Sequence, residues 1–246
     1  MIKPEVTFLV GSGVRVRMVN RNWWYLDDLN TCRLYYVHDG EARFFCGEKR
    51  VLLQPRNIYF IPSNLPFRVE TDEEEPFVHT FFDFYMRPAL IEDSIPEFRI
   101  QQYPMLERLM DTAAELMTLD PSLCFTGSEY TPVIACLNAM LALIAYDRQL
   151  TYACDPVIVE ALDIIHARFR ENIRVSELSQ LLGYTEDAFI RKFRSIMKTT
   201  PYAYIKSLKL HEAKYLQSTG CRTAEIAQTL GYSDSSALCH LLKKNS

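Results

Sequence analysis

The most constraining feature of this 246-residue chain is a segment that occurs twice near its C-terminus. Residues 178–186 (LSQLLGYTE) align with residues 226–234 (IAQTLGYSD), so the second copy follows the first by 48 positions. After one additional residue the alignment continues through these pairs: Ala188 with Ala237, Phe189 with Leu238, Arg191 with His240, Phe193 with Leu242 and Arg194 with Lys243. The chain therefore contains one structural motif twice.

Each copy has the features of two helices joined by a tight turn. Gly183 and Gly231 are placed to end the first helix of each copy in a left-handed conformation, and an aromatic residue follows each glycine. Thr185 and Ser233 are predicted to cap the second helix. This pattern is typical of a helix-turn-helix, in which the second helix enters a DNA groove.

The second helix of the first copy is predicted to have a core face and a basic face. Phe189 and Phe193 share the core face with Leu178 and Leu182 of the preceding helix. The basic face carries four cations within eight residues: Arg191, Lys192, Arg194 and Lys198. In an isolated copy such a face is usually just solvated. Two copies joined by a helix over residues 201–217, about 25 Å long, instead suit two segments of groove about one DNA turn apart.

The distribution of charge limits DNA binding to the C-terminal part. Residues 155–246 carry 13 Lys and Arg against 10 Asp and Glu, whereas residues 1–154 carry 14 against 21. Hydrophobic residues make up 48% of the chain and charged residues 24%, as expected for a globular protein. No signal peptide and no apolar run of 18 residues occur, so we expect a cytoplasmic protein without a membrane partner. Its seven scattered cysteines are expected to stay reduced.

The N-terminal part is predicted to be a β-sandwich or barrel. Eight short, aromatic and β-branched segments are separated by turn residues, and they are 14–18, 23–26, 32–38, 42–46, 50–53, 58–61, 67–70 and 77–84. Apolar residues then recur at helical spacing over 106–117 and 133–144. The second of these helices is apolar on more than one side. It therefore either covers a barrel face or also forms a dimer interface.

Residues 155–246 resemble the paired helix-turn-helix domain of the AraC (arabinose-regulator) family of bacterial transcription factors. The resemblance implies that each second helix contacts the major groove on one face of the DNA. It predicts DNA contacts from both copies: Thr185, Glu186, Asp187, Ile190, Arg191, Arg194, Ser233, Ser235, Ser236, Cys239, His240 and Lys243. Promoter DNA is thus the predicted partner, together with RNA polymerase if the protein is an activator.

Four residues around the first helices and the connecting helix depart from the family pattern. Lys198 stands where the family has glycine, and Lys209 replaces the usual arginine of the connecting helix. Arg174 and Arg222 occupy positions that usually cap the first helix of each copy. We therefore expect both of these first helices to be less stable.

The second copy departs further. His240 replaces the usual arginine, Leu242 replaces the usual phenylalanine, and the sequence stops at Ser246, about ten residues before the family pattern ends. Histidine is mostly neutral at pH 7, so a weaker and more pH-dependent DNA contact is expected from this copy. A regulator with an impaired second helix-turn-helix is accordingly one alternative.

Residues 35–40 and 52–62 resemble two hairpins of the family's cupin sensor domain. The predicted fold is therefore α+β and multidomain: a cupin-like barrel over 1–100, a helical dimerisation region and linker over 101–154, and an all-α domain with two helix-turn-helix motifs over 155–246. A cupin enzyme would need three histidines and a glutamate for its metal. Only His38 and His79 lie in this part, so we expect no metal, no cofactor and no enzymatic activity.

The remaining use of the barrel is to bind a small organic effector, such as a sugar, between its sheets. The residues predicted to bind it are Trp23, Trp24, Tyr36, His38, His79 and Phe81. The last two are implied by the resemblance and lie on one face of a strand. Aromatic residues that only fill the core are the alternative. The sequence thus predicts a homodimeric transcription regulator that responds to a small effector or, alternatively, to a protein partner.

Overall fold

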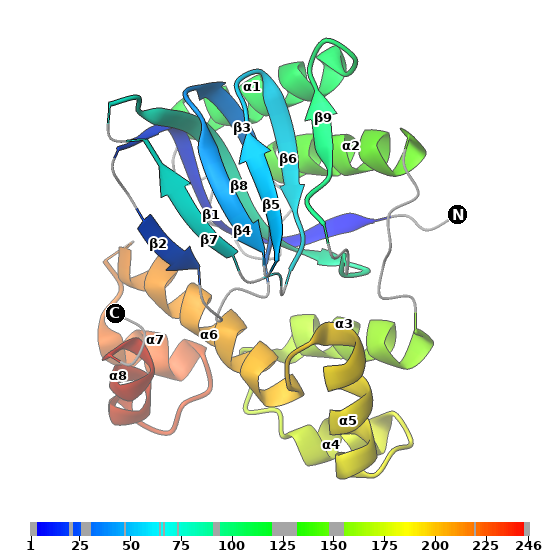
Figure 1. Ribbon diagram of the computed structural model, residues 1–246. Helices are drawn as coiled ribbons and strands as arrows, with labels where there is room; N and C mark the ends of the chain where they lie inside the picture. Colours follow the sequence, from blue (N-terminus) through cyan, green and yellow to red (C-terminus); the bar gives the residue numbers. More distant parts are fainter. Residues whose placement is uncertain are drawn as a thin grey trace. The chain divides into compact units, whose positions relative to one another are not determined.

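A computed structural model describes residues 4–19, 22–25, 31–46, 48–63, 65, 67–72, 74–90, 94–119, 132–147, 155–218 and 220–243. Contacts between residues divide the chain into two compact units, Met1–Tyr152 and Ala153–Ser246. The first unit combines β-sheets with two helices, and the second is helical (Figure 1). This is the predicted α+β, multidomain fold.

The first unit contains two antiparallel sheets. A five-stranded sheet has the order β1-β8-β3-β6-β9, and a four-stranded sheet has the order β2-β7-β4-β5. The strands are β1 (Glu5–Met18), β2 (Asn22–Tyr25), β3 (Cys32–Asp39), β4 (Ala42–Cys46), β5 (Lys49–Leu53), β6 (Asn57–Ile61), β7 (Phe67–Thr71), β8 (Phe77–Arg87) and β9 (Glu97–Arg99). β9 and most of β1 were not predicted from the sequence. β9 has only three residues, and register shifts along β1 interrupt its alternation.

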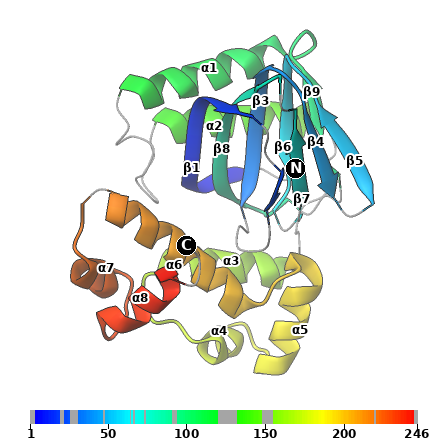
Figure 2. The ribbon, with the colours of Figure 1, turned by 60° about the vertical axis from the view of Figure 1, so that its left-hand side comes forward.

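The five-stranded sheet is the middle layer of this unit (Figure 2). One of its faces packs on the four-stranded sheet around Tyr35, Phe44 and Phe67. The other face packs on α1 (Pro104–Leu119) and α2 (Pro132–Asp147) around Phe82 and Leu137. Both faces are buried, which explains why β6 is buried at all five positions.

Helix α2 covers the sheet with one apolar stripe. Its buried residues are Val133, Ile134, Leu137, Met140, Leu141 and Ile144. Asn138, the polar residue inside this apolar helix, accepts a hydrogen bond from the Val6 backbone N–H at 2.7 Å. That N–H belongs to β1, so Asn138 connects the helix to the edge of the sheet.

The second unit consists of six helices within the described part of residues 155–243. They are α3 (Pro156–Arg168), α4 (Val175–Leu181), α5 (Glu186–Met197), α6 (Pro201–Ser218), α7 (Thr223–Thr229) and α8 (Ser235–Lys243). Asp155 caps α3, because its Oδ1 accepts hydrogen bonds from Val157 and Ile158 N–H at 3.1 and 3.3 Å. Helices α4 and α5 form the first copy of the repeat, α7 and α8 form the second, and α6 connects them.

Candidate functional site

The two copies of the repeat make the same turn. In the first, Gly183 N–H donates to the Gln180 carbonyl and Tyr184 N–H to the Ser179 carbonyl, at 3.0 and 2.8 Å. In the second, the residues 48 positions later make the same two hydrogen bonds at 3.1 and 2.9 Å. Both turn glycines have positive φ, 74° for Gly183 and 69° for Gly231. The sequence repeat is therefore a structural repeat.

The structure places Thr185 at the predicted N-cap position of α5, whereas the prediction that Ser233 caps α8 is wrong. Thr185 has the backbone conformation of a cap, but its side chain makes no capping hydrogen bond, and the acidic Glu186 and Asp187 occupy the first turn of α5 instead. At α8 the capping acceptor is Asp234, whose Oδ1 accepts from Ser236 and Ala237 N–H at 2.7 and 3.2 Å. Asp234, one residue after Ser233, therefore satisfies two backbone donors of the first turn of α8.

Helix α5 turns a polar face to solvent. Phe189, Phe193 and Met197 are buried, whereas five of the six residues predicted to contact DNA are exposed and Ile190 is half-buried. The exposed five are Thr185, Glu186, Asp187, Arg191 and Arg194.

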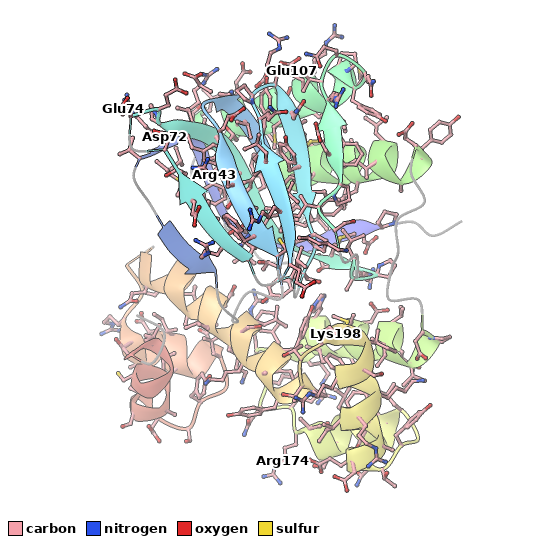
Figure 3. The ribbon with its side chains drawn as sticks, in the orientation of Figure 1. Arg43, Asp72, Glu74, Glu107, Arg174 and Lys198 are labelled. Atoms are coloured by element: carbon pink, nitrogen blue, oxygen red, sulfur yellow. The ribbon has the colours of Figure 1, made fainter. Side chains whose placement is uncertain are left out.

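Two of the four predicted cations are engaged within the unit. Lys192 Nζ lies 2.6 Å from Asp155 Oδ2 at the start of α3. Lys198 Nζ donates to the Ser195 carbonyl at 2.8 Å, and Figure 3 shows it at the end of α5. The sequence spacing did not reveal the partner of Lys192, because Asp155 lies 37 residues earlier. Arg191 and Arg194 are both exposed on α5.

The second copy places its predicted residues at the start of α8. Ser233 and Ser236 are exposed, and Ser235 and Cys239 are half-buried. The side chains of His240 and Lys243 lie outside the described part of the structure. The core positions Ile226 and Leu238 are 1% and 0% exposed, so they match the buried Leu178 and Phe189 of the first copy.

Both first helices start without a side-chain cap from the arginine at that position. Arg174 makes no capping hydrogen bond and points away from the helices (Figure 3). At α7 the Glu225 side chain reaches back to accept from the Arg222 N–H at 3.1 Å, and its Oε1 accepts from the Arg222 Nε at 3.0 Å. The glutamate therefore satisfies one backbone donor that the arginine cannot.

In the first unit, His79 and Phe81 face the space between the two sheets. The His79 ring lies 4.8 Å from the Tyr35 ring and 5.7 Å from the Phe81 ring, measured between centroids. His79 is 2% exposed, and its Nδ1 has no hydrogen-bond partner among the described residues. Burial lowers the pKa of His79 to about 4, and the nearby His38 acts in the same direction.

The same face carries a buried ion pair that was not predicted from the sequence. Arg33 Nε lies 2.8 Å from Asp83 Oδ1, with the two side chains only 3% and 9% exposed. The Arg33 guanidinium lies 5.4 Å from the centroid of Phe67, on the opposite sheet. Burial raises the pKa of Asp83 and the charge of Arg33 opposes this. Strand alternation could have indicated the position of Arg33, because Arg33 is two residues before Tyr35 and so lies on the same face of β3.

The six predicted effector residues do not line one pocket. Tyr36 and His38 lie on the opposite face of the five-stranded sheet from His79 and Phe81, because β8 pairs Thr80, and not His79, with Tyr36. Tyr36 Oη donates to Glu107 Oε1 of α1 at 2.7 Å, and His38 Nε2 lies 2.8 Å from Thr80 Oγ1. The cross-strand register decides the face, and the sequence alone does not give that register.

The two predicted tryptophans lie on β2, where Trp23 pairs with Val69 and Trp24 with Arg68. Their side chains fall outside the described residues, so neither is assigned to a face.

On the helix-covered face, the polar side chains share a partly buried environment. Burial raises the pKa of the Tyr36 hydroxyl, and the hydrogen bond to Glu107 adds to the effect. Burial also lowers the pKa of His38, with Arg15 acting in the same direction and Glu107 opposing. The Tyr36 hydrogen bond connects β3 to α1, whereas the His38 hydrogen bond connects β3 to Thr80 of β8.

The described ranges contain further polar side chains outside these two sites. No group of three or more His, Cys, Asp or Glu side chains there is arranged to hold a metal ion. A polar depression lies on the four-stranded sheet, lined by Glu41, Arg43, Leu52, Glu70, Asp72 and Glu75. Figure 3 labels two of these lining residues, Arg43 and Asp72. None of the described helices is both long and apolar enough to span a membrane.

Comparison with known families matches both units. Residues 28–150 match the AraC-like ligand binding domain, and residues 178–245 match a helix-turn-helix domain. The first match alone covers half of the chain.

Individual relatives are distant. The HTH-type transcriptional regulator YisR of Bacillus subtilis is 28% identical over 150 residues, which are 61% of this chain and 48% of that protein. The raffinose operon transcriptional regulatory protein RafR of Pediococcus pentosaceus is 20% identical over 226 residues, or 87% and 80% of the two chains. The matches to YisR and to a second B. subtilis regulator, YbfI, span only 48% and 27% of those proteins.

Among solved structures, ToxT from Vibrio cholerae bound to an unsaturated fatty acid has a TM-score of 0.56 and 10% identity. The likeness covers 98% of this chain and 89% of that one. At this identity it supports the two-part fold alone.

Proposed function

Because the chain belongs to the AraC family of transcription regulators, we propose that it binds a specific promoter sequence through α5 and α8 and responds to a small organic effector held between its two sheets. The observation that supports this most is the pair of matching turns, followed in the first copy by an exposed helix face with Arg191 and Arg194. Such a regulator acts on chromosomal DNA, so we place it in the cytoplasm and assign it no enzymatic activity.

The proposed DNA contacts differ in strength between the copies. Arg191 and Arg194 of α5 provide permanent charges, whereas the corresponding positions of α8 are His240 and Lys243. The first copy therefore dominates the affinity. Footprinting on a duplex selected from a random-sequence pool tests this: His240→Ala should cost less affinity than Arg191→Ala, and equal losses would contradict it.

The proposed effector site is the inner face of β3 and β8. Its aromatic residues, Tyr35 and Phe81, suit the apolar face of a ring, and the buried Arg33–Asp83 pair suits hydroxyl or carboxylate groups. A sugar has both an apolar ring face and hydroxyl groups. The His79 imidazole lies beside both rings and supplies a polar group that suits the orientation of a ligand at this position.

Thermal unfolding of the whole protein tests the effector site. We expect a sugar such as raffinose to raise the Tm of the wild type and not that of Phe81→Leu, which keeps apolar volume and loses the ring. An unsaturated fatty acid serves as the second probe, since a carboxylate could also bind Arg33. Equal Tm increases in wild type and variant would contradict this placement. If the affinity for DNA changes only when a protein fraction from a cell extract is added, and with neither small molecule, control by a protein partner would be favoured.

We also propose that the protein is a homodimer that uses the outer face of α2. Ala139, Ala142, Leu143 and Tyr146 lie exposed on that face, and Leu143 and Tyr146 are 38% and 88% exposed. Two subunits would place four helix-turn-helix motifs on the DNA. Sedimentation velocity at micromolar concentration tests the dimer. If the protein activates transcription, RNA polymerase is a further partner.

A further inference from the structure

The two turn glycines have the same backbone conformation but different surroundings. A Cβ atom on Gly183 would meet no atom within 4 Å among the described residues. On Gly231 it would lie 2.7 Å from the Arg170 carbonyl oxygen and 3.2 Å from the Asn172 nitrogen. The turn of the second copy is therefore packed against the backbone between α3 and α4, whereas the turn of the first copy is open. The sequence repeat does not account for this difference.

Helix α6 makes a second contact with the same turn. Lys209 is 6% exposed, and its Nζ donates to the Leu230 carbonyl at 2.7 Å. The ammonium also lies 4.9 Å from the centroid of the Tyr232 ring. A cation at the carbonyl end of α7 satisfies an oxygen that has no partner within its own helix and complements the helix dipole. Lys209 thus attaches the turn of the second copy to the connecting helix.

A third contact joins α6 to the segment that follows α3. Glu212 lies one helical turn after Lys209 on α6 and is 4% exposed. Its Oε1 accepts from Arg170 Nε at 3.0 Å and from Arg170 Nη2 at 2.7 Å. Arg170 therefore contacts α6 through its side chain and Gly231 through its carbonyl. The end of α3, the middle of α6 and the turn between α7 and α8 are held together by three residues.

We propose that Arg170, Lys209 and Glu212 form a positioning clamp that fixes the second helix-turn-helix relative to the first and so sets the half-site spacing that the protein accepts. The inference rests on the proposed DNA contacts of both copies. One base pair of additional spacing moves a half-site by about 3.4 Å and rotates it by about 34°. A rigid clamp cannot follow that displacement, whereas a loosened one can. None of the three residues needs to touch DNA for this role.

The test uses the whole protein and the duplex with the highest affinity selected from a random-sequence pool. Footprinting locates the two half-sites, and their spacing is then changed by one or two base pairs. We expect the wild type to lose about tenfold in affinity at the altered spacings. The quantity compared is the ratio of the affinity at the selected spacing to the affinity at an altered spacing. Lys209→Met should lower this ratio to about threefold or less, because it removes the contact with the Leu230 carbonyl. Lys209→Arg should restore the wild-type ratio, since a guanidinium can donate to the same carbonyl.

A simple loss of stability would weaken binding at every spacing and leave the ratio unchanged, so the ratio isolates the positioning role. Circular dichroism checks that each variant is folded. If Lys209→Met is unfolded, Glu212→Gln decides by the same ratio, because it keeps the shape of the side chain and removes its charge. A wild-type ratio in the folded variant would overturn the clamp. A wild-type footprint over one half-site would overturn it as well, and DNA binding by α5 would still stand.

Discussion

Lys198 ends α5 with φ of 56°, a left-handed conformation that lysine seldom adopts. The AraC family pattern has glycine at this position, which carries no Cβ and adopts positive φ without strain. Lys198→Gly should therefore stabilise the helical unit by about 1 kcal/mol, despite the loss of the hydrogen bond to Ser195. Urea unfolding followed by circular dichroism measures this change.

The matched control is Lys198→Ala, which also removes the hydrogen bond but keeps a Cβ atom. It should give no gain, because the strain of positive φ remains. Equal stabilities of the glycine and alanine variants would show that the backbone conformation at this position costs nothing.

His79 makes the stability of the first unit depend on pH. Its folded pKa of about 4 lies below the value of about 6.5 expected in the unfolded chain. Between these values the unfolded chain binds a proton that the folded unit does not. The contribution of His79 to the free energy of unfolding should thus be at its full value above about pH 6.5. It should fall by about 3 kcal/mol as the pH decreases to about 4.

His79→Phe isolates this contribution, because phenylalanine keeps the ring among Tyr35, Phe77 and Phe81 and does not titrate. Urea unfolding at several pH values from 7.5 to 4.5 should give a flatter dependence for the variant than for the wild type. Carboxylates titrate in both proteins and cancel in the comparison. Parallel curves would contradict the assignment of a neutral, buried His79.

At the scale of elements, Asp155 connects two helices of the second unit. One oxygen caps α3, and the other lies 2.6 Å from Lys192 of α5. Hydrogen bonding to Lys192 holds the pKa of Asp155 below its usual range. Asp155→Ala should lower the free energy of unfolding of the helical unit by about 1 to 2 kcal/mol, mainly through the lost cap.

Asp155→Asn separates the two roles, because asparagine caps helices nearly as well and has no charge. It should retain most of the stability and move α5 only slightly. Unfolding in urea compares the three proteins. A variant as unstable as Asp155→Ala would show that the ion pair, and not the cap, stabilises this junction.

The helical elements were largely predictable from the sequence, and the sheets only in part. Leu178 and Gly183 have counterparts 48 positions later, and Phe189 has one 49 positions later, so local spacing predicts both helix-turn-helix motifs. In β1, bulges break the alternation around Gly11 and Gly13, so its length could not be predicted. The clamp of Lys209 on Leu230 joins residues 21 positions apart and follows from packing.

For the candidate effector site, the sequence predicts only which residues of one strand share a face. Alternation correctly places His79 with Phe81, since both are on β8. Whether Tyr36 joins them depends on the register between β3 and β8, which local sequence does not determine. The Arg33–Asp83 pair is a further case: a charged residue in an apolar strand signals a partner but does not identify it.

At the scale of the whole molecule, the two units differ in charge. The part of the chain that carries both helix-turn-helix motifs has more basic than acidic residues, and the sheet-containing part has an excess of acidic ones. DNA phosphates attract the helical part and repel the sheet-containing part. The salt dependence of DNA binding should therefore come from the helical unit alone. We propose that the exposed face of α5 is the part of this unit that recognises a specific DNA sequence.

The most direct test is a titration of the selected duplex, and of its single-base variants, with wild type, Arg191→Ala and Arg191→Lys. Arg191→Ala should lose about 1 to 3 kcal/mol of binding free energy and the preference at one base pair. Arg191→Lys should retain the salt dependence and lose the base preference, because an ammonium cannot make the bidentate contact of a guanidinium. Unchanged affinity and unchanged base preference in Arg191→Ala would contradict the claim.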